Sequence, residues 1–570
     1  MLIVNNQTYR LLVRILKEGR AHIPSFAFLG GLGLVMVPVE LYALLLTRKM
    51  IDQGFLLQNW NLSRNIVFVI VLLFVIRSII SYVSQLFSAR LQLRINQKFQ
   101  DRIFFHLLRL PMHNLTRQPT GRVMSRIIDD GTLFSTIFGQ AFGKAIQEPV
   151  KVIDLVGLLI YFNFRLWAVL LISTILSFMV IHWLGKKLHV ISRHIQNKDA
   201  AIYSYLEQML TSMELIKSRA TEYQTAFGYR QHLDEFIQLS LRIHKITLIA
   251  RPILQVLKYL AIGAVLLYGS WMISDSVLTV GTLTTFLGAT YLFFNAVSAT
   301  GNLYGSLRAN LARMEAVYSI LDTPTEGNAV NYETPKPLAV EKLAFDSVMF
   351  GYDPAVPVLK GVSFSINAGT VFGITGQSGS GKTTLLRLLV RFYDPDSGDV
   401  RLNDQSIQNI GLTDLRSSIG IVFQENFILD DTIWNNIVYG KTDISDSQVR
   451  FASEMAGAHN FILSLPDHYH TVVGERGKRL SGGQRQRLAI ARAMAADPAI
   501  LILDEGTSFL EITQESAILQ NLKGLRREKI TIVVSHRLSA MKKADRIITL
   551  DNGRILETDF QALVNAVKVA

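Results

Sequence analysis

A glycine-rich loop in the second half of the chain has the residue types and spacing of a phosphate-binding loop. The loop, Gly376–Thr384, follows an apolar stretch typical of a strand, Val371–Thr375, and precedes one typical of a helix, Leu385–Val390. Its glycines allow backbone N–H groups to curl around phosphates, and the helix N-terminus adds positive potential. Lys382 would reach the β- and γ-phosphates, and the Thr383 hydroxyl would coordinate Mg²⁺. The residues of the loop predicted to bind ATP are Gly376, Gln377, Ser378, Gly379, Ser380, Gly381, Lys382, Thr383 and Thr384.

Two adjacent carboxylates follow another apolar stretch. Asp504 and Glu505 come directly after Ala499–Leu503, which is typical of a buried strand. In this position Asp504 can hold Mg²⁺, and Glu505 can polarise the attacking water. His536 follows the apolar stretch Thr531–Val534 and can hydrogen-bond a γ-phosphate. The predicted catalytic residues are Glu505, His536 and Lys382.

A further segment, Leu480–Arg487, indicates a second anion site. Ser481 and Gly482 stand at the start of a predicted helix rich in Ala and Arg, and a helix N-terminus attracts anions. One chain already carries a complete phosphate-binding loop. The second site therefore predicts that two chains share each nucleotide.

Together these segments resemble the nucleotide-binding domain of an ABC transporter. The resemblance implies that Tyr352 stacks on adenine, and that Gln424 contacts Mg²⁺ and couples the ATPase domain to a membrane half. It also implies that Ser481–Gln484 clasps the ATP held by the opposite chain. The ATP-binding set is thereby completed by Tyr352, Gln424, Ser481, Gly482, Gly483, Gln484 and Asp504, and the Mg²⁺ set is Thr383, Gln424 and Asp504.

One segment departs from the family pattern. Where the family usually has Ser-Ala-Leu-Asp, this chain has Ser508-Phe509-Leu510-Glu511, which keeps the carboxylate on a side chain one methylene longer. The catalytic residues themselves are intact. This predicts a homodimer with two competent sites, and a heterodimer with a second half-transporter is the alternative.

The first half of the chain has the composition of a membrane protein. The 570-residue chain is 49% hydrophobic and only 18% charged. The segments 87–141 and 186–249 keep helical periodicity and are rich in Lys and Arg, so the positive-inside rule places them, both termini and the ATPase domain in the cytoplasm. The same cytoplasmic bias explains the net charge of +13, and no nucleic-acid partner is predicted. Six stretches are long enough to span a bilayer, roughly 24–46, 65–86, 142–163, 166–185, 250–272 and 281–305.

These observations predict a two-part fold. Residues 1–320 would form a membrane α-helical domain of six transmembrane helices with long cytoplasmic extensions. Residues 321–340 would be a linker, and residues 341–570 an α/β P-loop NTPase domain of the ABC type. The turns between the cytoplasmic extensions, Thr120–Arg126 and Glu207–Arg219, would contact the ATPase domain and carry its motion to the spans.

Several ionisable side chains lie within the apolar stretches. A charge at the centre of a bilayer costs several kcal/mol, so it faces the interior of the bundle or a wet cavity. Glu40, which follows the helix-bending Pro38, and Arg77, near the middle of the second span, are candidate substrate contacts; the alternative is contact with a neighbouring helix. Lys144, Glu148 and Lys151 are spaced to share one helix face and to neutralise one another.

Six spans fused ahead of an ATPase domain resemble a type IV exporter half-transporter, and the membrane half is similar to the MsbA-type lipid flippase and multidrug exporter group. The resemblance implies ATP-driven export of a lipid or another amphipathic molecule by alternating access, from a bacterial inner membrane. The alternatives are a multidrug exporter of the same fold and, from another class, an ATP-gated channel or regulatory membrane ATPase. In the last span, Asn295–Ser298 stands where basic contacts to a lipid headgroup are expected, which argues against lipid A as the cargo.

Overall fold

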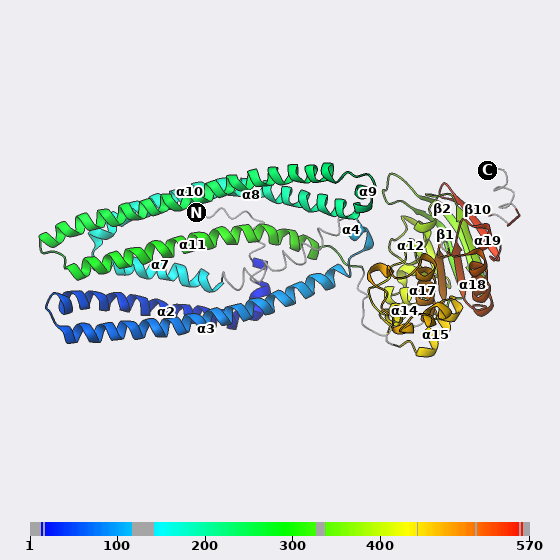
Figure 1. Cartoon of the computed structure of the whole chain (residues 1–570), viewed down its shortest axis with the longest axis horizontal. Helices are drawn as coiled ribbons and strands as arrows, with labels where there is room; N and C mark the ends of the chain where they lie inside the picture. The colour runs from blue at the N-terminus through cyan, green and yellow to red at the C-terminus, as the bar shows by residue number, and fades with distance from the viewer. Residues whose placement is uncertain are drawn as a thin grey trace. The chain divides into compact units, whose positions relative to one another are not determined.

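The computed structural model of the chain contains two compact units, which are described separately. The first comprises Met1–Leu108 and Thr116–Pro324, and the second comprises Arg109–Leu115 and Thr325–Ala570. The first is helical, and the second contains two β-sheets and their covering helices (Figure 1). The residues that the structure describes are 13–14, 17–116, 142–326, 336, 338–441, 443–507, 510–557 and 560–561.

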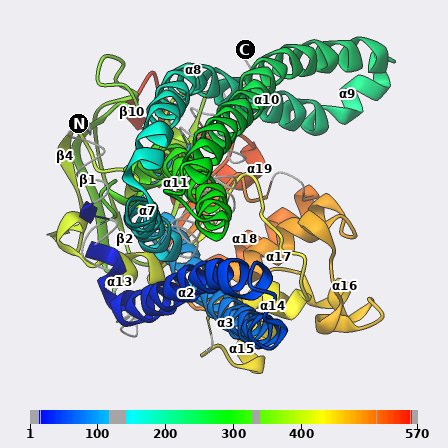
Figure 2. The same ribbon diagram turned by 90° about the vertical axis from the view of Figure 1, so that its left-hand side faces the viewer.

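Long helices make up the first unit. Helix α2 packs against α3 and α7, α7 packs against α11, and α8 runs along α10, as two views of the bundle show (Figures 1 and 2). The elements are a 3-10 turn at Gly19–His22, α2 (Ile23–Lys49), a π-helical turn at Met50–Phe55, α3 (Trp60–Leu107), α7 (Phe142–Phe162), α8 (Phe164–Thr211), α9 (Met213–Ser218), α10 (Glu222–Ser274) and α11 (Val280–Leu321).

The predicted spans all lie within these helices, and several helices extend far beyond them. In the described part of the chain, four helical segments are long and apolar enough to cross a membrane, and Phe164–Val180 is a shorter apolar helix. The predicted third span corresponds to α7, whose sequence contains four charged residues, Lys144, Glu148, Lys151 and Asp154. The structure therefore contains membrane-spanning helices, and the count of six stays a prediction. The four segments are Gly19–Phe55, Trp60–Leu107, Pro252–Ser274 and Val280–Gly301.

Side-chain caps fix the beginnings of three long helices at tight turns. The Asn59 side chain accepts from Leu62 N at the start of α3, and Asn163 accepts from Arg165 N at 2.9 Å at the start of α8. Thr279 caps α11 in the same way. Such caps satisfy backbone N–H groups that have no partner within the helix.

Of the two predicted cytoplasmic turns, only one is described. Around Glu207–Arg219, the short helix α9 separates α8 from α10, as expected of a turn between two helical extensions. The other predicted turn, Thr120–Arg126, lies outside the described residues.

The second unit is built on a six-stranded sheet with the order β10-β9-β3-β8-β7-β6 and a four-stranded antiparallel sheet with the order β2-β1-β4-β5. In the larger sheet β6, β7, β8, β3 and β9 are parallel and β10 is antiparallel to β9. The strands are β1 (Lys342–Phe350), β2 (Leu359–Asn367), β3 (Val371–Gly376), β4 (Ser397–Leu402), β5 (Gln405–Ser406), β6 (Ile419–Val422), β7 (Ile500–Asp504), β8 (Ile530–Val534), β9 (Arg546–Asp551) and β10 (Arg554–Glu557).

Short helices surround the sheets. The central strands β7 and β8 are buried along their whole length, as expected for parallel strands covered on both faces. The helices are α4 (Met112–Thr116), α12 (Lys382–Leu389), α13 (Leu412–Ser417), α14 (Ile433–Val438), α15 (Asp446–Met455), α16 (His459–Leu463), α17 (Gly482–Ala495), α18 (Ile512–Leu525) and α19 (Leu538–Met541), with 3-10 turns at Ile407–Asn409, His468–His470 and Glu475–Gly477.

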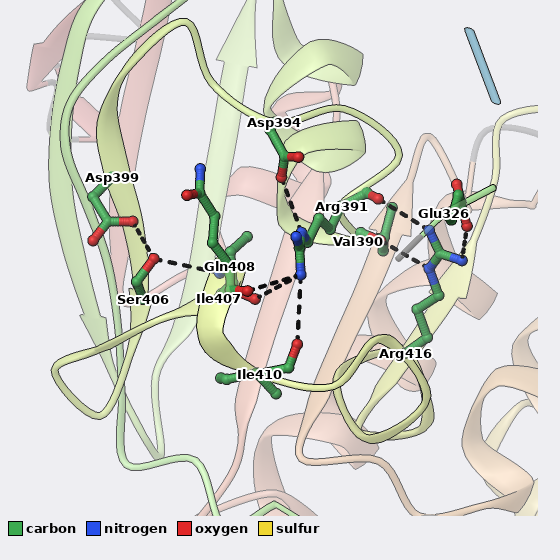
Figure 3. A network of polar contacts seen from close by, with 10 residues as sticks. All are labelled: Glu326, Val390, Arg391, Asp394, Asp399, Ser406, Ile407, Gln408, Ile410 and Arg416. Carbon is green, nitrogen blue, oxygen red and sulfur yellow. Dashed lines mark hydrogen bonds and ion pairs between the residues drawn. The ribbon is translucent and has the colours of Figure 1, made fainter. Parts of the chain in front are cut away.

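Two arginines anchor the end of α12, the helix that follows the phosphate-binding loop (Figure 3). Arg391 Nε donates to Asp394 at 2.9 Å, and its guanidinium also bonds backbone carbonyls of the segment 407–410. Arg416 donates to the carbonyls of Val390 and Arg391 and forms an ion pair of 2.6 Å with Glu326, at the start of the linker. The C-terminal end of α12 is therefore held by cations, which suits the negative end of a helix dipole.

Candidate nucleotide-binding site and membrane charge cluster

The predicted phosphate-binding loop joins β3 to α12 and has the backbone geometry that such a loop needs. Gly376 and Gly381 have φ values of +148° and +108°, in the region that favours glycine. A Cβ at Gly376 would lie 2.2 Å from the carbonyl oxygen of Leu550, so a side chain there would displace the backbone. Both glycines are required by the local backbone, independently of any ligand.

Polar groups converge on the loop. Lys382 Nζ folds back and donates to the carbonyls of Gly376 and Gln377, each at 2.8 Å. Burial lowers the pKa of Lys382, and the nearby Glu505 and Asp504 oppose that effect. The Ser380 hydroxyl is buried and has no hydrogen-bond partner among the described residues. A buried donor without a partner is unfavourable, so this loop fits a ligand with hydrogen-bond acceptors such as a phosphate.

The two predicted carboxylates end β7 beside this loop. Asp504 is buried, and burial, together with the neighbouring Glu505, raises its pKa to about 6, while Lys382 opposes the rise. A hydroxyl, an amide and a carboxylate, from Thr383, Gln424 and Asp504, form the hard oxygen donor set that Mg²⁺ prefers. No group of three or more His, Asp or Glu in the described part of the chain could hold a metal, so Mg²⁺ would be held together with substrate phosphates.

Three predicted residues meet at the end of β7. Gln424 Nε2 donates to Glu505 Oε2 at 3.0 Å, and His536 Nδ1 lies 3.7 Å from Glu505 Oε1. Glu505 itself has a φ of +49°, which is uncommon for a residue with a side chain, and Gln486 Nε2 donates to its carbonyl at 3.0 Å. The arrangement places an amide, a carboxylate and an imidazole together, as a site that orients water against a phosphate requires.

Tyr352 lies beside the phosphate-binding loop with 39% of its surface exposed. Its hydroxyl is 3.2 Å from Thr384 Oγ1 and accepts from Arg387 Nη1 at 3.0 Å. The rings of Phe350 and Tyr393 pack edge-on or tilted against it and each other. The ring is thus held in place at the surface, and its stacking on adenine stays a prediction.

The segment Ser481–Gln484 forms the N-terminal turn of α17, as predicted. Gln484 N donates to Ser481 Oγ at 3.2 Å, and Ser481 N donates to Gln484 Oε1 at 2.8 Å. This reciprocal capping box fixes the start of a 14-residue helix. Its contact with a nucleotide of a second chain stays a prediction, and Ser508 and Phe509 of the departing segment lie outside the described residues.

In the membrane half, Glu40, Arg77 and Lys151 form one cluster. The Glu40 carboxylate is 9% exposed and pairs through one oxygen with Arg77 Nη2 and through the other with Lys151 Nζ. Arg77 Nε is buried without a hydrogen-bond partner among the described residues. Two cations therefore share one anion, and Glu148 and Asp154 lie within one helical turn of Lys151 on α7.

Lys151 has a partner that the sequence did not indicate. The mutual neutralisation of Lys144, Glu148 and Lys151 along one face of α7 stays a prediction, and the structure pairs Lys151 with Glu40 because α2 packs against α7. Periodicity along one helix cannot reveal a partner on another helix. The side chain of Lys144 is not among those described.

The sequence also left one polar group of the second unit unnoticed. Glu515 is buried completely on α18 and is hydrogen-bonded by Thr507 and Ser539. A signal was present in the sequence, because Glu515 stands three residues before Ile518 and four before Leu519. This spacing places the carboxylate on the apolar face of a helix.

Comparison with known proteins covers both units. A family model described as ABC transporter matches residues 359–508, and one described as ABC transporter transmembrane region matches residues 27–297. Two similar proteins are named ATP-dependent lipid A-core flippase. The one from Syntrophus aciditrophicus (strain SB) is 30% identical over 97% of this chain and 92% of its own length. The one from Shewanella frigidimarina (strain NCIMB 400) is 32% identical over 86% of this chain and 82% of its own length.

A solved structure has the same fold over nearly the whole chain. It is that of a bacterial Atm1-family ABC exporter with ATP bound, with a TM-score of 0.86 and 25% sequence identity. The match covers 97% of this chain and 99% of that one. Both proteins therefore combine a helical bundle with a domain that contains β-sheets.

Proposed function

This chain belongs to the ABC transporter family, and we propose that it exports a lipid with an anionic headgroup, working as a homodimer. The family and fold class predicted from the sequence are confirmed: the chain is an ATP-hydrolysing half-transporter of the exporter type, embedded in a membrane. A half-transporter carries one membrane domain and one ATPase domain, so it functions as a dimer.

The charge cluster in the membrane half carries the proposal for the substrate. Arg77 and Lys151 share the single carboxylate of Glu40 within an apolar bundle. Ionisable groups at that depth are expensive and pair with one another or with a substrate. The buried Arg77 Nε offers a further donor to an incoming anion.

Two further observations support an amphipathic lipid. Many apolar side chains on the helices are exposed in the single chain and would face lipid, cargo or the second chain; Phe68, for example, is 70% exposed. The relatives are named for a lipid, which favours lipid over a multidrug substrate. The segment Asn295–Ser298 of the last span lacks the basic residues expected to contact a lipid headgroup. We therefore assign recognition of the headgroup to Arg77 and Lys151.

For hydrolysis, we assign a role to each residue at the end of β7. Glu505 would orient and polarise the attacking water, Lys382 would neutralise charge on the transferred phosphoryl group, and His536 would hydrogen-bond the γ-phosphate. Mg²⁺, held by Thr383, Gln424 and Asp504 with the phosphates, supplies further charge stabilisation when bound. Gln424 already bonds Glu505, so it can hold that carboxylate in place.

Alternating access would connect hydrolysis to transport. ATP, bound by the loop Gly376–Thr384 of one chain and Ser481–Gln484 of the other, would close the two ATPase domains and open the membrane cavity outward. Hydrolysis would then reset the dimer. We propose a bacterial inner membrane as the location, with both termini and the ATPase domain in the cytoplasm, because the Lys- and Arg-rich segments then obey the positive-inside rule.

Stimulation of ATPase activity tests the substrate class. Wild-type protein in lipid nanodiscs is compared with Lys151→Gln, which removes one of the two cations, and with the control Arg64→Gln, which removes a charge from the exposed start of α3. Anionic lipids should stimulate the wild type and the control but not Lys151→Gln, with basal activity retained in all three. Stimulation of the wild type by many uncharged drugs and not by anionic lipids would establish the multidrug alternative.

Transport in sealed vesicles separates an exporter from a channel. An ATP-dependent gradient of the stimulating lipid between the two leaflets supports export. Movement that only equalises the leaflets would identify an ATP-gated channel or scramblase-like regulator instead.

A further inference from the structure

We propose that Glu515 is a positioning residue for ATP hydrolysis, because it ties together the two loops that carry Glu505 and His536. The proposal rests on the function proposed above, in which these two residues act on the attacking water and the γ-phosphate. Glu515 lies on the first turn of α18, and none of its surface is exposed. Carboxylates are almost never buried to this degree unless they are paired and hydrogen-bonded.

Each oxygen of Glu515 accepts a hydrogen bond from a different loop. Thr507 Oγ1, in the segment after β7, donates to Oε1 at 2.5 Å. Ser539 Oγ, on α19 after β8, donates to Oε2 at 2.6 Å. Thr507 is itself 2% exposed. The carboxylate therefore bridges the segments that leave two adjacent strands of the sheet.

Arg537 adds a second tie between the same segments. Its Nη1 lies 3.9 Å from Glu515 Oε2 and donates to the carbonyls of Leu510 at 2.9 Å and Thr507 at 3.4 Å. The guanidinium thus balances the buried negative charge and also holds the backbone after Glu505. Charge and hydrogen bonds are both satisfied, which a buried ion pair needs to be tolerated.

The interactions of Glu515 and Arg537 both lie close in sequence to the proposed catalytic residues. Thr507 is two positions after Glu505, and Arg537 directly follows His536. The positive φ of Glu505, +49°, is a conformation that surrounding contacts must maintain. The 3.7 Å separation of Glu505 and His536 is therefore set in part by Glu515 through the loops on either side. Small displacements of groups that orient a nucleophile are costly to the rate.

Steady-state kinetics of the full-length protein in nanodiscs test this role, with kcat and KM for ATP and thermal unfolding measured for each variant. Glu515→Gln keeps the shape but loses the charge and one acceptor, and Thr507→Val removes one of the two hydroxyl donors. Both should lower kcat by about tenfold or more while KM stays within about threefold, because the phosphate-binding loop is untouched. Thr507→Ser keeps the hydroxyl and should restore kcat.

The control is Glu528→Gln, at an exposed glutamate just after α18, which should behave as the wild type. Wild-type kcat in Glu515→Gln and Thr507→Val would overturn the proposal. So would a fall in kcat that tracks a loss of thermal stability and is not rescued in Thr507→Ser, because that marks a purely structural role. Glu505→Gln is measured in parallel. If it hydrolyses ATP at the wild-type rate the proposed function fails, whereas if it is inactive and Glu515→Gln is normal, only the role of Glu515 fails.

Discussion

At the scale of single residues, Asp504 shows a conflict between stability and function. The ionised carboxylate is buried beside Glu505, and these two factors raise its pKa to about 6. Since an unfolded aspartate titrates near 3.8, the folded protein without ligand binds a proton more readily than the unfolded chain between these pH values. The free energy of unfolding therefore falls as the pH rises through that window, and the full cost is present above about pH 6.

Asp504→Asn should accordingly stabilise the nucleotide-free protein at pH 7.5 while abolishing Mg²⁺-dependent hydrolysis. The pKa difference corresponds to at most about 3 kcal/mol, or on the order of 5 °C in Tm. The gain over the wild type should shrink as the pH is lowered towards 4, where the native carboxylate is already protonated. Thermal unfolding of both proteins at the two pH values measures this.

Asp467→Asn is the matched control for Asp504→Asn. Asp467 is exposed and is not part of the proposed nucleotide site, so its substitution should not alter Tm. With Mg²⁺ and ATP present, the wild type and the control should gain more stability than Asp504→Asn, because a ligand that binds only the folded state raises Tm. A lower Tm for Asp504→Asn without nucleotide would contradict the argument.

At the scale of elements, α12 is fixed at both ends. Its N-terminus begins in the phosphate-binding loop, and its C-terminal carbonyls accept hydrogen bonds from Arg416, which also pairs with Glu326 of the linker (Figure 3). Glu326 N in turn donates to the carbonyl of Arg109, at the start of the segment that follows α3. Arg416 thus joins the end of α12 to the segment that follows α11.

Two substitutions separate the effects of this anchor. Arg416→Gln removes all three interactions and should lower stability by about 1–3 kcal/mol, because carbonyls at the end of α12 lose their donor. Glu326→Gln removes only one partly exposed ion pair and should cost less than about 1 kcal/mol. It should nevertheless reduce lipid transported per ATP hydrolysed, since the linker is released from α12. Glu315→Gln, exposed on α11, is the control, and unchanged coupling in Glu326→Gln would show that this ion pair does not transmit motion.

The strands that lie next to the nucleotide-binding motifs could be predicted from the sequence. The strands that carry no such motif could not. Strands β3, β7 and β8 match the predicted apolar stretches to within about one residue, because fully buried parallel strands are uniformly apolar. The antiparallel sheet of β1, β2, β4 and β5 was not foreseen, since its register comes from pairing between distant segments. The same limit explains why the bond between Lys151 and Glu40 and the burial of Glu515 emerged only from the packing of separate helices.

At the scale of the whole molecule, the chain forms two compact units. Residues Arg109–Leu115 group with the second unit although they follow α3, and the predicted domain boundaries stay a prediction. A composition shift along the chain places the break near residues 320–340, but it cannot show that an earlier segment belongs to the later domain.

The assembled transporter provides the last prediction, because its cycle requires two chains. In Glu505→Gln the phosphate-binding loop and the segment Ser481–Gln484 remain intact, so ATP should still bind and draw two ATPase domains together. Loss of the polarising carboxylate should lower kcat by about 100-fold or more.

The closed dimer should therefore accumulate with ATP retained. Retention of radiolabelled ATP after rapid desalting measures it, and Glu505→Gln combined with Lys382→Ala, which removes a phosphate ligand, is the control that should retain none. Normal turnover by Glu505→Gln would transfer the catalytic role to another residue. Retention of one ATP per dimer, in place of two, would show that the two sites act in turn.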